Sequence, residues 1–344
     1  MGKITTFFRG KNLKNAPIGH KRKRILCSGI VATLAILIVT AICANIDWQM
    51  VKDENTARLR GYTPSAEITK MSDELKLMRK GKAVFYATSP SLQKSETFNQ
   101  KCSFDGVGAL TLGCYYHDKY NNENIVIYDY GMQSISENGL HYNFSERAKI
   151  TALHEMLHAV YDRLGVDKKE DSCRKLKTVI SGIDNLNEEL SHYSEQEQCT
   201  EMFARFGSEY LPELHTRTSL VGESIANSFD EAQVEAFSQL TDLYDDYFDC
   251  RDASIADAYW GNENRLKQYS EKLDSYHSNL GREESRVKGL ISDYYRNPTW
   301  SGYNSVNSEI DNYNEQLAYY NSLVGTYNKV QNIFDSKNSA ISSL

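Results

Sequence analysis

The chain has 344 residues, with 39 lysines and arginines against 46 aspartates and glutamates, which gives a formal net charge of −7. Residues 1–24 hold eight of the basic residues and no acidic one, so residues 25–344 carry 31 basic and 46 acidic side chains, a net charge of −15. A body this acidic lacks the positive surface that attracts nucleic acid, and an apolar content of 40% excludes general disorder.

An apolar run at 25–46 follows this basic leader. Its 22 residues include no acidic or basic side chain and are enough to cross a bilayer as a helix. By the positive-inside rule, the leader then lies in the cytoplasm and the rest of the chain lies outside. A cleaved signal peptide is the alternative, although its apolar region is typically only about 7–15 residues long. We therefore expect a single-pass protein of the cell membrane with extracytoplasmic C-terminal domains.

Five of the seven cysteines follow the anchor, in a compartment that permits disulfides. Cys102 and Cys114 flank a short stretch with glycines and are the pair that we expect to be bonded. Among Cys173, Cys199 and Cys250, one must stay unpaired or bind another group, and the sequence leaves open which one.

After the anchor, helical and strand-like segments alternate. A capping threonine followed by Pro64 predicts a helix that ends at Gly81. Runs of β-branched and aromatic residues predict strands at 83–87, 110–116 and 125–128. These strands would form a small sheet, and one of them could bind an extended peptide by β-addition.

A helix with clear boundaries follows the predicted sheet. Asn143 and Glu146 form a capping-box-like start, and Gly165 marks its end. Apolar residues at helical spacing give this helix a face for burial. They are Ala152, Leu153, Met156, Leu157, Val160 and Leu164.

Two more helices are predicted further along the chain. The first begins at Ser194, with Glu197 as its capping partner, and ends near Gly207. The second spans about 230–247.

Residues 260–344 change in character. Apolar and tyrosine residues recur at alternating spacings of three and four on both sides of Asn297-Pro298, and Val324 and Tyr327 belong to this pattern. Heptads on either side of a proline predict an antiparallel helical hairpin, a coiled coil whose two helices bury their apolar residues against each other. Because tyrosine packs a seam less tightly than leucine, a protein partner on the hairpin is the alternative.

The most informative segment is His154-Glu155-Met156-Leu157-His158, which has the H-E-x-x-H spacing of a zinc site. Two histidines four residues apart on a helix lie on one face, close enough to bind one metal ion. Glu155, between them, can reach a water at that metal and act as general base. The alternative, histidines that only pack or form hydrogen bonds, is disfavoured by the capped and uncharged helix.

The flanks of this motif resemble the longer zincin metallopeptidase pattern, since Glu155 carries the one charge between residues 151 and 160. Catalytic zinc takes three protein ligands and leaves one position for water. The metzincin branch would require glycine at Tyr161 and histidine at Leu164, and neither is present. In the gluzincin branch a later helix supplies a glutamate.

We expect Glu201 to be that third ligand, because it lies in the middle of the predicted helix beside apolar residues. Glu197 is the alternative ligand, but it already has a capping role. The alternative role for Glu201 is a surface ion pair with Arg205 at i,i+4.

The order of segments also resembles membrane-anchored, gluzincin-like metallopeptidases of small-genomed bacteria, over roughly residues 60–335. This resemblance implies zinc peptidase activity, with His154, His158 and Glu201 as ligands, and it names no substrate. Peptide deformylases, which combine H-E-x-x-H with a cysteine ligand, are the competing family, and Cys199 would be that ligand. Their cysteine precedes the helix, whereas Cys199 follows it. The segments that match the gluzincin-like metallopeptidases are 84–87, 112–115, 154–161, 200–202, 313–314 and 327–328.

The expected architecture is an N-terminal transmembrane helix, an α+β zincin-like domain at 47–250 and a helical hairpin at 260–344. The expected activity is hydrolysis of peptide bonds in a peptide or protein substrate, by a water that Zn²⁺ activates, with Glu155 as general base. The rival is a surface adhesion or scaffold protein that uses its coiled coil and has a structural or inactive metal site. Attack on the peptide carbonyl forms an oxyanion, and the candidate hydrogen-bond donors to it are His192, Tyr193, Tyr210 and His215.

Overall fold

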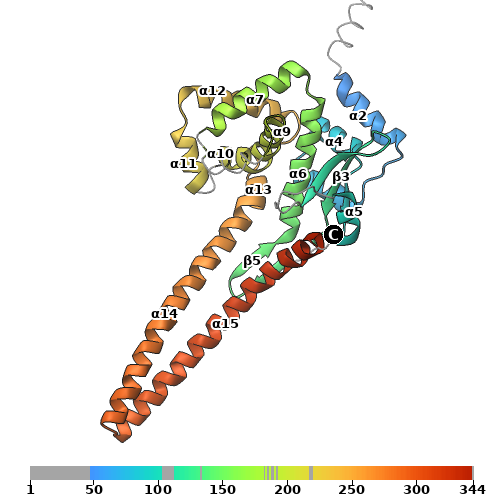
Figure 1. Ribbon diagram of the computed structural model, residues 1–344. Helices are drawn as coiled ribbons and strands as arrows, with labels where there is room; N and C mark the ends of the chain where they lie inside the picture. Colours follow the sequence, from blue (N-terminus) through green and yellow to red (C-terminus); the bar gives the residue numbers. More distant parts are fainter. Residues whose placement is uncertain are drawn as a thin grey trace, which may run out of the picture. The chain divides into compact units, whose positions relative to one another are not determined.

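A computed structural model describes residues 47–102, 112–131, 134–181, 183, 186, 190, 193–216 and 220–342. The chain divides into two compact units, Met1–Trp48 and Gln49–Leu344. The second unit is mostly helical and contains two small sheets, which agrees with the predicted α+β class (Figure 1). The predicted leader and anchor, 1–24 and 25–46, lie outside the described residues. Within those residues, no helix combines the length and the apolar character needed to cross a bilayer.

Three short helices precede the first sheet. Ser65 caps the second of them, since its hydroxyl accepts a hydrogen bond from the Ile68 N–H (3.2 Å). The prediction that this helix runs to Gly81 is wrong, because the chain turns at Lys76, where φ is +52°, and then starts a new helix. The three helices are α2 (Trp48–Leu59), α3 (Ala66–Glu74) and α4 (Arg79–Ala87).

The prediction of a strand at 83–87 is also wrong, since these residues belong to α4. Four of the five are buried, and a short apolar run that is buried all round has no period that separates strand from helix. Gly81 lies where α4 meets another segment, because a Cβ there would be 1.9 Å from the Tyr247 carbonyl oxygen. The glycine therefore permits close packing and does not end a helix.

The first sheet has the strand order β1–β3–β2, with β1 parallel and β2 antiparallel to β3. β2 and β3 confirm strands predicted at 110–116 and 125–128, as far as these residues are described. The expected Cys102–Cys114 disulfide is present and joins the end of α5 (Ser95–Lys101) to β2. The strands are β1 (Ser91–Gln93), β2 (Gly113–His117), β3 (Glu123–Tyr128), β4 (Ser134–Glu137) and β5 (Leu140–Asn143).

A second, two-stranded sheet consists of β4 and β5, which the sequence analysis did not predict. Asn138 and Gly139 connect the two strands with φ values of +52° and +83°, as a two-residue type I′ turn requires. This hairpin leads directly into α6.

The central helix is α6 (Phe144–Arg163), which packs against β2, β3, α4 and α9. Asn143 caps it as predicted, since its side chain accepts a hydrogen bond from the Ser145 N–H (3.0 Å). Glu146 accepts a hydrogen bond from the side-chain amide of Asn143 (3.3 Å). The backbone N–H of Asn143, which a capping box would pair with Glu146, donates to Asn262 (3.2 Å).

The helices from α6 onward bear out two predicted starts and one predicted end, and they correct one predicted end. Ser194 and Glu197 form the capping box of α9, and Asp230 caps α12. α6 ends at Arg163 with Leu164 as its C-cap, so Gly165 follows the end of that helix as predicted, and it is also the N-cap of α7. α9 does not end near Gly207 but continues through a π-helix, η1, into α10. The helices are α7 (Val166–Ile180), α9 (Glu195–Arg205), η1 (Phe206–Tyr210), α10 (Leu211–Thr216), α11 (Leu220–Ser228) and α12 (Glu231–Asp245).

Two long helices, α14 and α15, lie side by side where the sequence predicts a hairpin (Figure 1). Arg286 pairs with Glu309, and Lys272 contacts Tyr319 (3.4 Å), so the two helices are antiparallel. The elements of this region are α13 (Ala253–Ala256), the π-helix η2 (Asp257–Gly261), α14 (Asn262–Arg296) and α15 (Trp300–Ser342).

The predicted seam is shifted in the second half of α15. Leu323 and Thr326 are buried, whereas Val324 and Tyr327 are only partly buried. This part of α15 contacts the β4–β5 hairpin, where the Asn138 amide donates to the Thr326 hydroxyl (2.8 Å). Packing on a second surface therefore changes which residues are buried.

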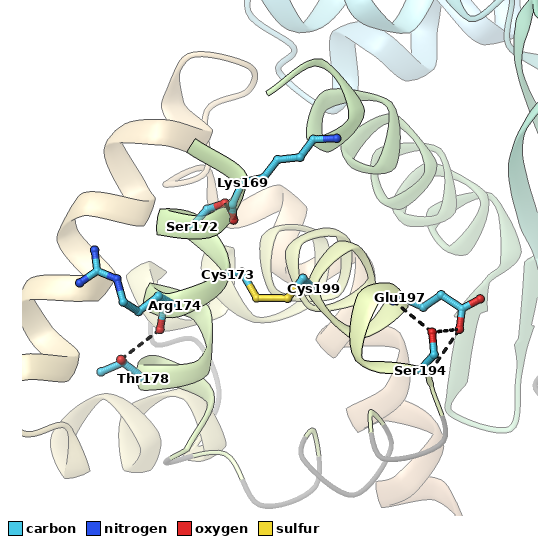
Figure 2. The surroundings of a disulfide bond; sticks show 8 residues. All are labelled: Lys169, Ser172, Cys173, Arg174, Thr178, Ser194, Glu197 and Cys199. Atoms are coloured by element: carbon cyan, nitrogen blue, oxygen red, sulfur yellow. Dashed lines mark hydrogen bonds between the residues drawn. A yellow bond between two sulfur atoms is a disulfide. The ribbon is translucent and has the colours of Figure 1, made fainter. Parts of the chain in front are cut away.

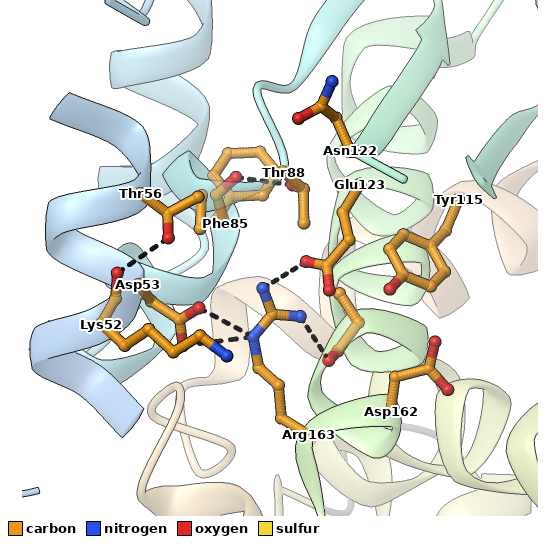
Figure 3. A network of polar contacts seen from close by, with 12 residues as sticks. Lys52, Asp53, Thr56, Phe85, Thr88, Tyr115, Asn122, Glu123, Asp162 and Arg163 are labelled. Atoms are coloured by element: carbon orange, nitrogen blue, oxygen red, sulfur yellow. Dashed lines mark hydrogen bonds and ion pairs between the residues drawn. The ribbon is translucent and has the colours of Figure 1, made fainter. Parts of the chain in front are cut away.

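A buried ion-pair network joins α2 and β3 to the C-terminal end of α6 (Figure 3). The Arg163 Nε lies 3.0 Å from a carboxylate oxygen of Asp53, and the guanidinium also pairs with Glu123. The side chains of Arg163 and Asp53 are only 9% and 4% exposed. Burial opposes the charge of Arg163, but the two carboxylates outweigh it and raise its pKa. The network therefore fixes the position of three elements at once.

Replacing Asp53 by alanine should lower the free energy of unfolding by about 3 kcal/mol, because Arg163 would keep a buried charge with one of its two carboxylates gone. Glu54→Ala on the same helix is the matched control. Its pair with Arg79 (2.9 Å) is exposed and screened by solvent, so its loss should lower the stability much less. Denaturant unfolding of the full-length protein measures both variants, and equal losses would refute a structural role for the network.

Candidate metal centre

The three residues that the sequence predicts as ligands lie together in the structure. His154 and His158 come from α6, one turn apart, and Glu201 comes from α9, which packs against α6. Their ligand atoms all lie within 4.8 Å of one another. In the described part of the chain, this is the one group of three or more histidine, cysteine or acidic side chains with such spacing.

The distances between the ligand atoms fit a tetrahedral metal ion. The two Nε2 atoms are 3.1 Å apart, and oxygens of Glu201 lie 3.7 Å from His154 Nε2 and 3.4 Å from His158 Nε2. A tetrahedral ion with bonds of about 2.0–2.1 Å places its ligand atoms about 3.3 Å apart. Imidazole nitrogen and carboxylate oxygen are also donors that transition metals accept. The residues present therefore can hold a metal ion.

Packing on the opposite face of each helix sets this arrangement. On α6, the residues next to the histidines, including Leu153 and Leu157, are fully buried, as is Phe203 on α9. The side chains of the three ligands are 14–17% exposed, so solvent reaches the centre. The site is thus built on a rigid core and remains open on one side.

Thr200, the neighbour of Glu201, supports His158 from behind. Its hydroxyl lies 3.0 Å from His158 Nδ1, the ring nitrogen that faces away from the cluster. A partner at this nitrogen fixes the orientation and tautomer of a metal-ligating histidine. Residue type alone does not assign Thr200 this role, although its position next to the expected third ligand is a signal.

The charges of the ligands depend on one another. Burial lowers the pKa of His154 to about 3, so this imidazole is neutral, as metal binding requires. Burial also disfavours charge on His158, but its hydrogen bond with Glu201 and the nearby carboxylates raise its pKa. Burial disfavours the charged form of Glu201 as well, yet the two histidines outweigh it and lower its pKa to about 2. Glu201 is therefore present as a carboxylate.

Glu155 lies beside the cluster and does not take part in it. Its side chain is buried, and burial raises its pKa to about 7, although His158 and a hydrogen bond with the backbone of Tyr115 oppose the shift. Tyr115 belongs to β2, an outer strand of the first sheet as described. Glu155 therefore lies between the metal centre and a strand edge.

Gly113 permits the close approach of β2 to α6. A Cβ at this position would lie 2.5 Å from Cγ2 of Thr151 and 2.9 Å from Cγ of Glu155. Both distances are shorter than real Cβ contacts, so a larger residue must displace the strand or Glu155. This role of Gly113 depends on a tertiary contact and is not apparent from the sequence.

Both alternative third ligands have other partners. Cys199 forms a disulfide with Cys173, so it has no free thiolate for a metal. Glu197 accepts a hydrogen bond from the Ser194 backbone (3.1 Å) at the start of α9. This leaves Glu201 as the residue that meets the two histidines.

Of the other predicted residues, Arg205 pairs with Glu209 (3.4 Å) at the next turn. Two of the candidate oxyanion donors contact side chains that are not part of the cluster. The ring of Tyr210 packs against Trp260 (5.7 Å), and the His215 ring lies 3.0 Å from the Thr241 hydroxyl. His192 lies outside the described residues, and Tyr193 is partly buried.

Replacing Gly113 by alanine should cost about 1–3 kcal/mol of unfolding free energy, because the new methyl group overpacks the contact with α6. Metal binding should persist, since the atoms nearest to the new methyl group belong to Thr151 and Glu155, which are not ligands. Gly289→Ala in α14 is the control. Its Cβ would meet nothing within 4 Å, and the better helix propensity should stabilise the protein by about 0.5–1 kcal/mol. Thermal unfolding and metal analysis measure both, and a Gly113→Ala protein as stable as the control would contradict this close contact.

No family model, no curated protein and no solved structure matches the chain.

Proposed function

We propose that this protein is a membrane-anchored, extracytoplasmic zinc metallopeptidase of the gluzincin type, which hydrolyses peptide bonds in a peptide or protein substrate. One observation carries the proposal: α9 brings Glu201 to within 3.4 Å and 3.7 Å of the two histidines on α6. Histidines that merely packed in a core would require no carboxylate from a distant helix at this point. The cluster is therefore best explained as a ligand set.

Zinc is the metal that we assign to it. Two histidines and one glutamate are a ligand set that catalytic zinc takes, and no sulfur ligand is available from the bonded Cys199. Structural zinc sites are usually closed by four protein ligands, whereas three ligands leave one position for water. The partial exposure of the ligand side chains supports an open, catalytic site.

A zinc ion held by His154, His158 and Glu201 supplies Lewis-acid chemistry, which polarises a peptide carbonyl and makes water more acidic. Glu155 accepts the proton of the attacking water and returns it to the leaving amine. Thr200 keeps the His158 ring in the orientation that ligation needs.

The edge of β2 is the place where we expect the substrate to bind. An extended peptide can add to an exposed strand edge through main-chain hydrogen bonds. β2 is an outer strand of the described sheet and lies next to Glu155, so a peptide along it would bring its backbone to the general base. Main-chain recognition of this kind places few demands on the substrate sequence.

The proposal predicts that Glu155→Gln lowers peptide hydrolysis by about 10²–10⁴-fold, because the amide cannot accept the proton of the attacking water. Zinc should stay bound, since Glu155 is not a ligand. Cleavage of a fluorescent denatured protein by the full-length chain, together with zinc content, measures both properties. Glu170→Gln, an exposed position on α7, is the matched control and should retain full activity.

A Glu155→Gln protein that cleaves as fast as the wild type would refute this role. A wild-type protein that binds zinc but cleaves none of a broad peptide library would favour the rival, an adhesion or scaffold protein with a structural metal site.

A further inference from the structure

A second disulfide, Cys173–Cys199, joins α7 to α9 close to the metal centre (Figure 2). The Cα atoms of the two cysteines are 5.3 Å apart. Cys199 directly precedes Thr200 and Glu201, the two residues of α9 that contact the histidines. A covalent bond therefore lies within two residues of both contacts.

Other forces hold α9 on either side of these residues. The capping box of Ser194 and Glu197 closes its first turn (Figure 2). Further along, Phe203 is fully buried, and its carbonyl accepts a hydrogen bond from the Tyr244 hydroxyl (2.7 Å). The side chains of Thr200 and Glu201 are polar and only partly buried, so they themselves are held by fewer apolar contacts than Phe203.

The arrangement also has an electrostatic cost. Glu201 is largely withdrawn from water, and a carboxylate loses hydration when it is buried. Metal binding requires two imidazoles and this carboxylate to be held in one place. If the protein already holds them there, less binding free energy is lost in ordering them, and the metal affinity is higher. A covalent link at Cys199 supplies such preorganisation.

Helix α7 is a fixed base for that link. Leu176, Val179 and Ile180 are buried, and the helix packs against α12 and α9. The Gln233 side chain of α12 also donates to the Thr178 carbonyl oxygen (3.3 Å). Gly165 connects α6, which carries the two histidines, directly to α7. The disulfide joins α7 to α9, which carries Glu201, so the two helices that bear the ligands are linked covalently through α7.

We propose that Cys173 and Cys199 are positioning residues of the metal centre: their disulfide sets Thr200 and Glu201 against the histidines, and metal affinity depends on it. The proposal rests on the proposed function, because it takes His154, His158 and Glu201 as zinc ligands.

The test is the zinc Kd of the full-length Cys173→Ser/Cys199→Ser protein, measured by competition with a chelator. The Kd should rise about 10–100-fold, the effect expected when the partners that orient metal ligands are lost. Serine is used in place of chemical reduction because a free thiolate at position 199 would itself bind zinc.

Cys102→Ser/Cys114→Ser is the matched control. The two disulfides close loops of 12 and 26 residues, and loop-closure entropy grows slowly with length, so both variants should lose comparable thermal stability. The zinc Kd of the control should stay within about twofold of wild type, because Cys102 and Cys114 pack in a separate apolar cluster with Phe98 and Val126. A merely structural role for both bonds would move the two Kd values together.

An unchanged Kd in Cys173→Ser/Cys199→Ser, or equal changes in both variants, would overturn the proposal. If the serine variant does not fold, Cys173→Val/Cys199→Ala restores apolar volume between the helices and is measured in the same way. Failure of both to fold would also overturn it, since the bond would then hold the fold and not the site. A wild-type protein without zinc affinity would overturn the proposed function itself, which separates the two claims.

Discussion

The packing of α9 against α6 is the contact on which the metal centre depends. Helical periodicity alone places two histidines on one face of α6, but the carboxylate must come from a separate helix. Gly207 lies in η1, which continues α9 and also packs on α6, and a Cβ there would be 2.4 Å from the Tyr244 ring of α12 and 2.7 Å from Leu157 of α6. A larger side chain would push the two helices apart and move Glu201 away from the histidines. A glycine that resembles a helix stop thus serves close packing.

Both ends of α6 are tied to distant segments, which gives the site a rigid frame. At the N-terminal end, the Asn262 side chain accepts from the Asn143 N–H (3.2 Å) and donates to the Asn143 carbonyl oxygen (2.8 Å). Asn262 is the first residue of α14, so the start of the helical hairpin is fixed to the start of the histidine-bearing helix. At the other end, Arg163 is held by Asp53 and Glu123. The histidines lie between these two attachments.

Features that depend on local chemistry could be predicted from the sequence. The H-E-x-x-H helix, the capping box at Ser194 and the break at Asn297-Pro298 each follow from a few neighbouring residues. Glu201 could be chosen over Glu197 because a capping residue already has a partner. These predictions needed no knowledge of distant contacts.

Features that depend on tertiary contacts could not be predicted in this way. The 83–87 run could not be recognised as a helix because burial on nearly all sides hides its period, and Gly81 and Gly207 lie at close tertiary contacts and do not end helices. Cys173 pairs with Cys199 through the packing of α7 on α9, which spacing does not reveal. The β4–β5 hairpin is different, since its Asn138-Gly139 turn was a local signal that went unused.

X-ray absorption at the zinc edge tests the central claim, that His154, His158 and Glu201 form a zinc site. Full-length protein loaded with one equivalent of zinc should show only nitrogen and oxygen neighbours at about 2.0–2.2 Å. Glu201→Ala should weaken zinc binding and reduce the number of these neighbours. A sulfur neighbour at about 2.3 Å would mean that a cysteine is the ligand, and a protein that binds no zinc would contradict the account altogether.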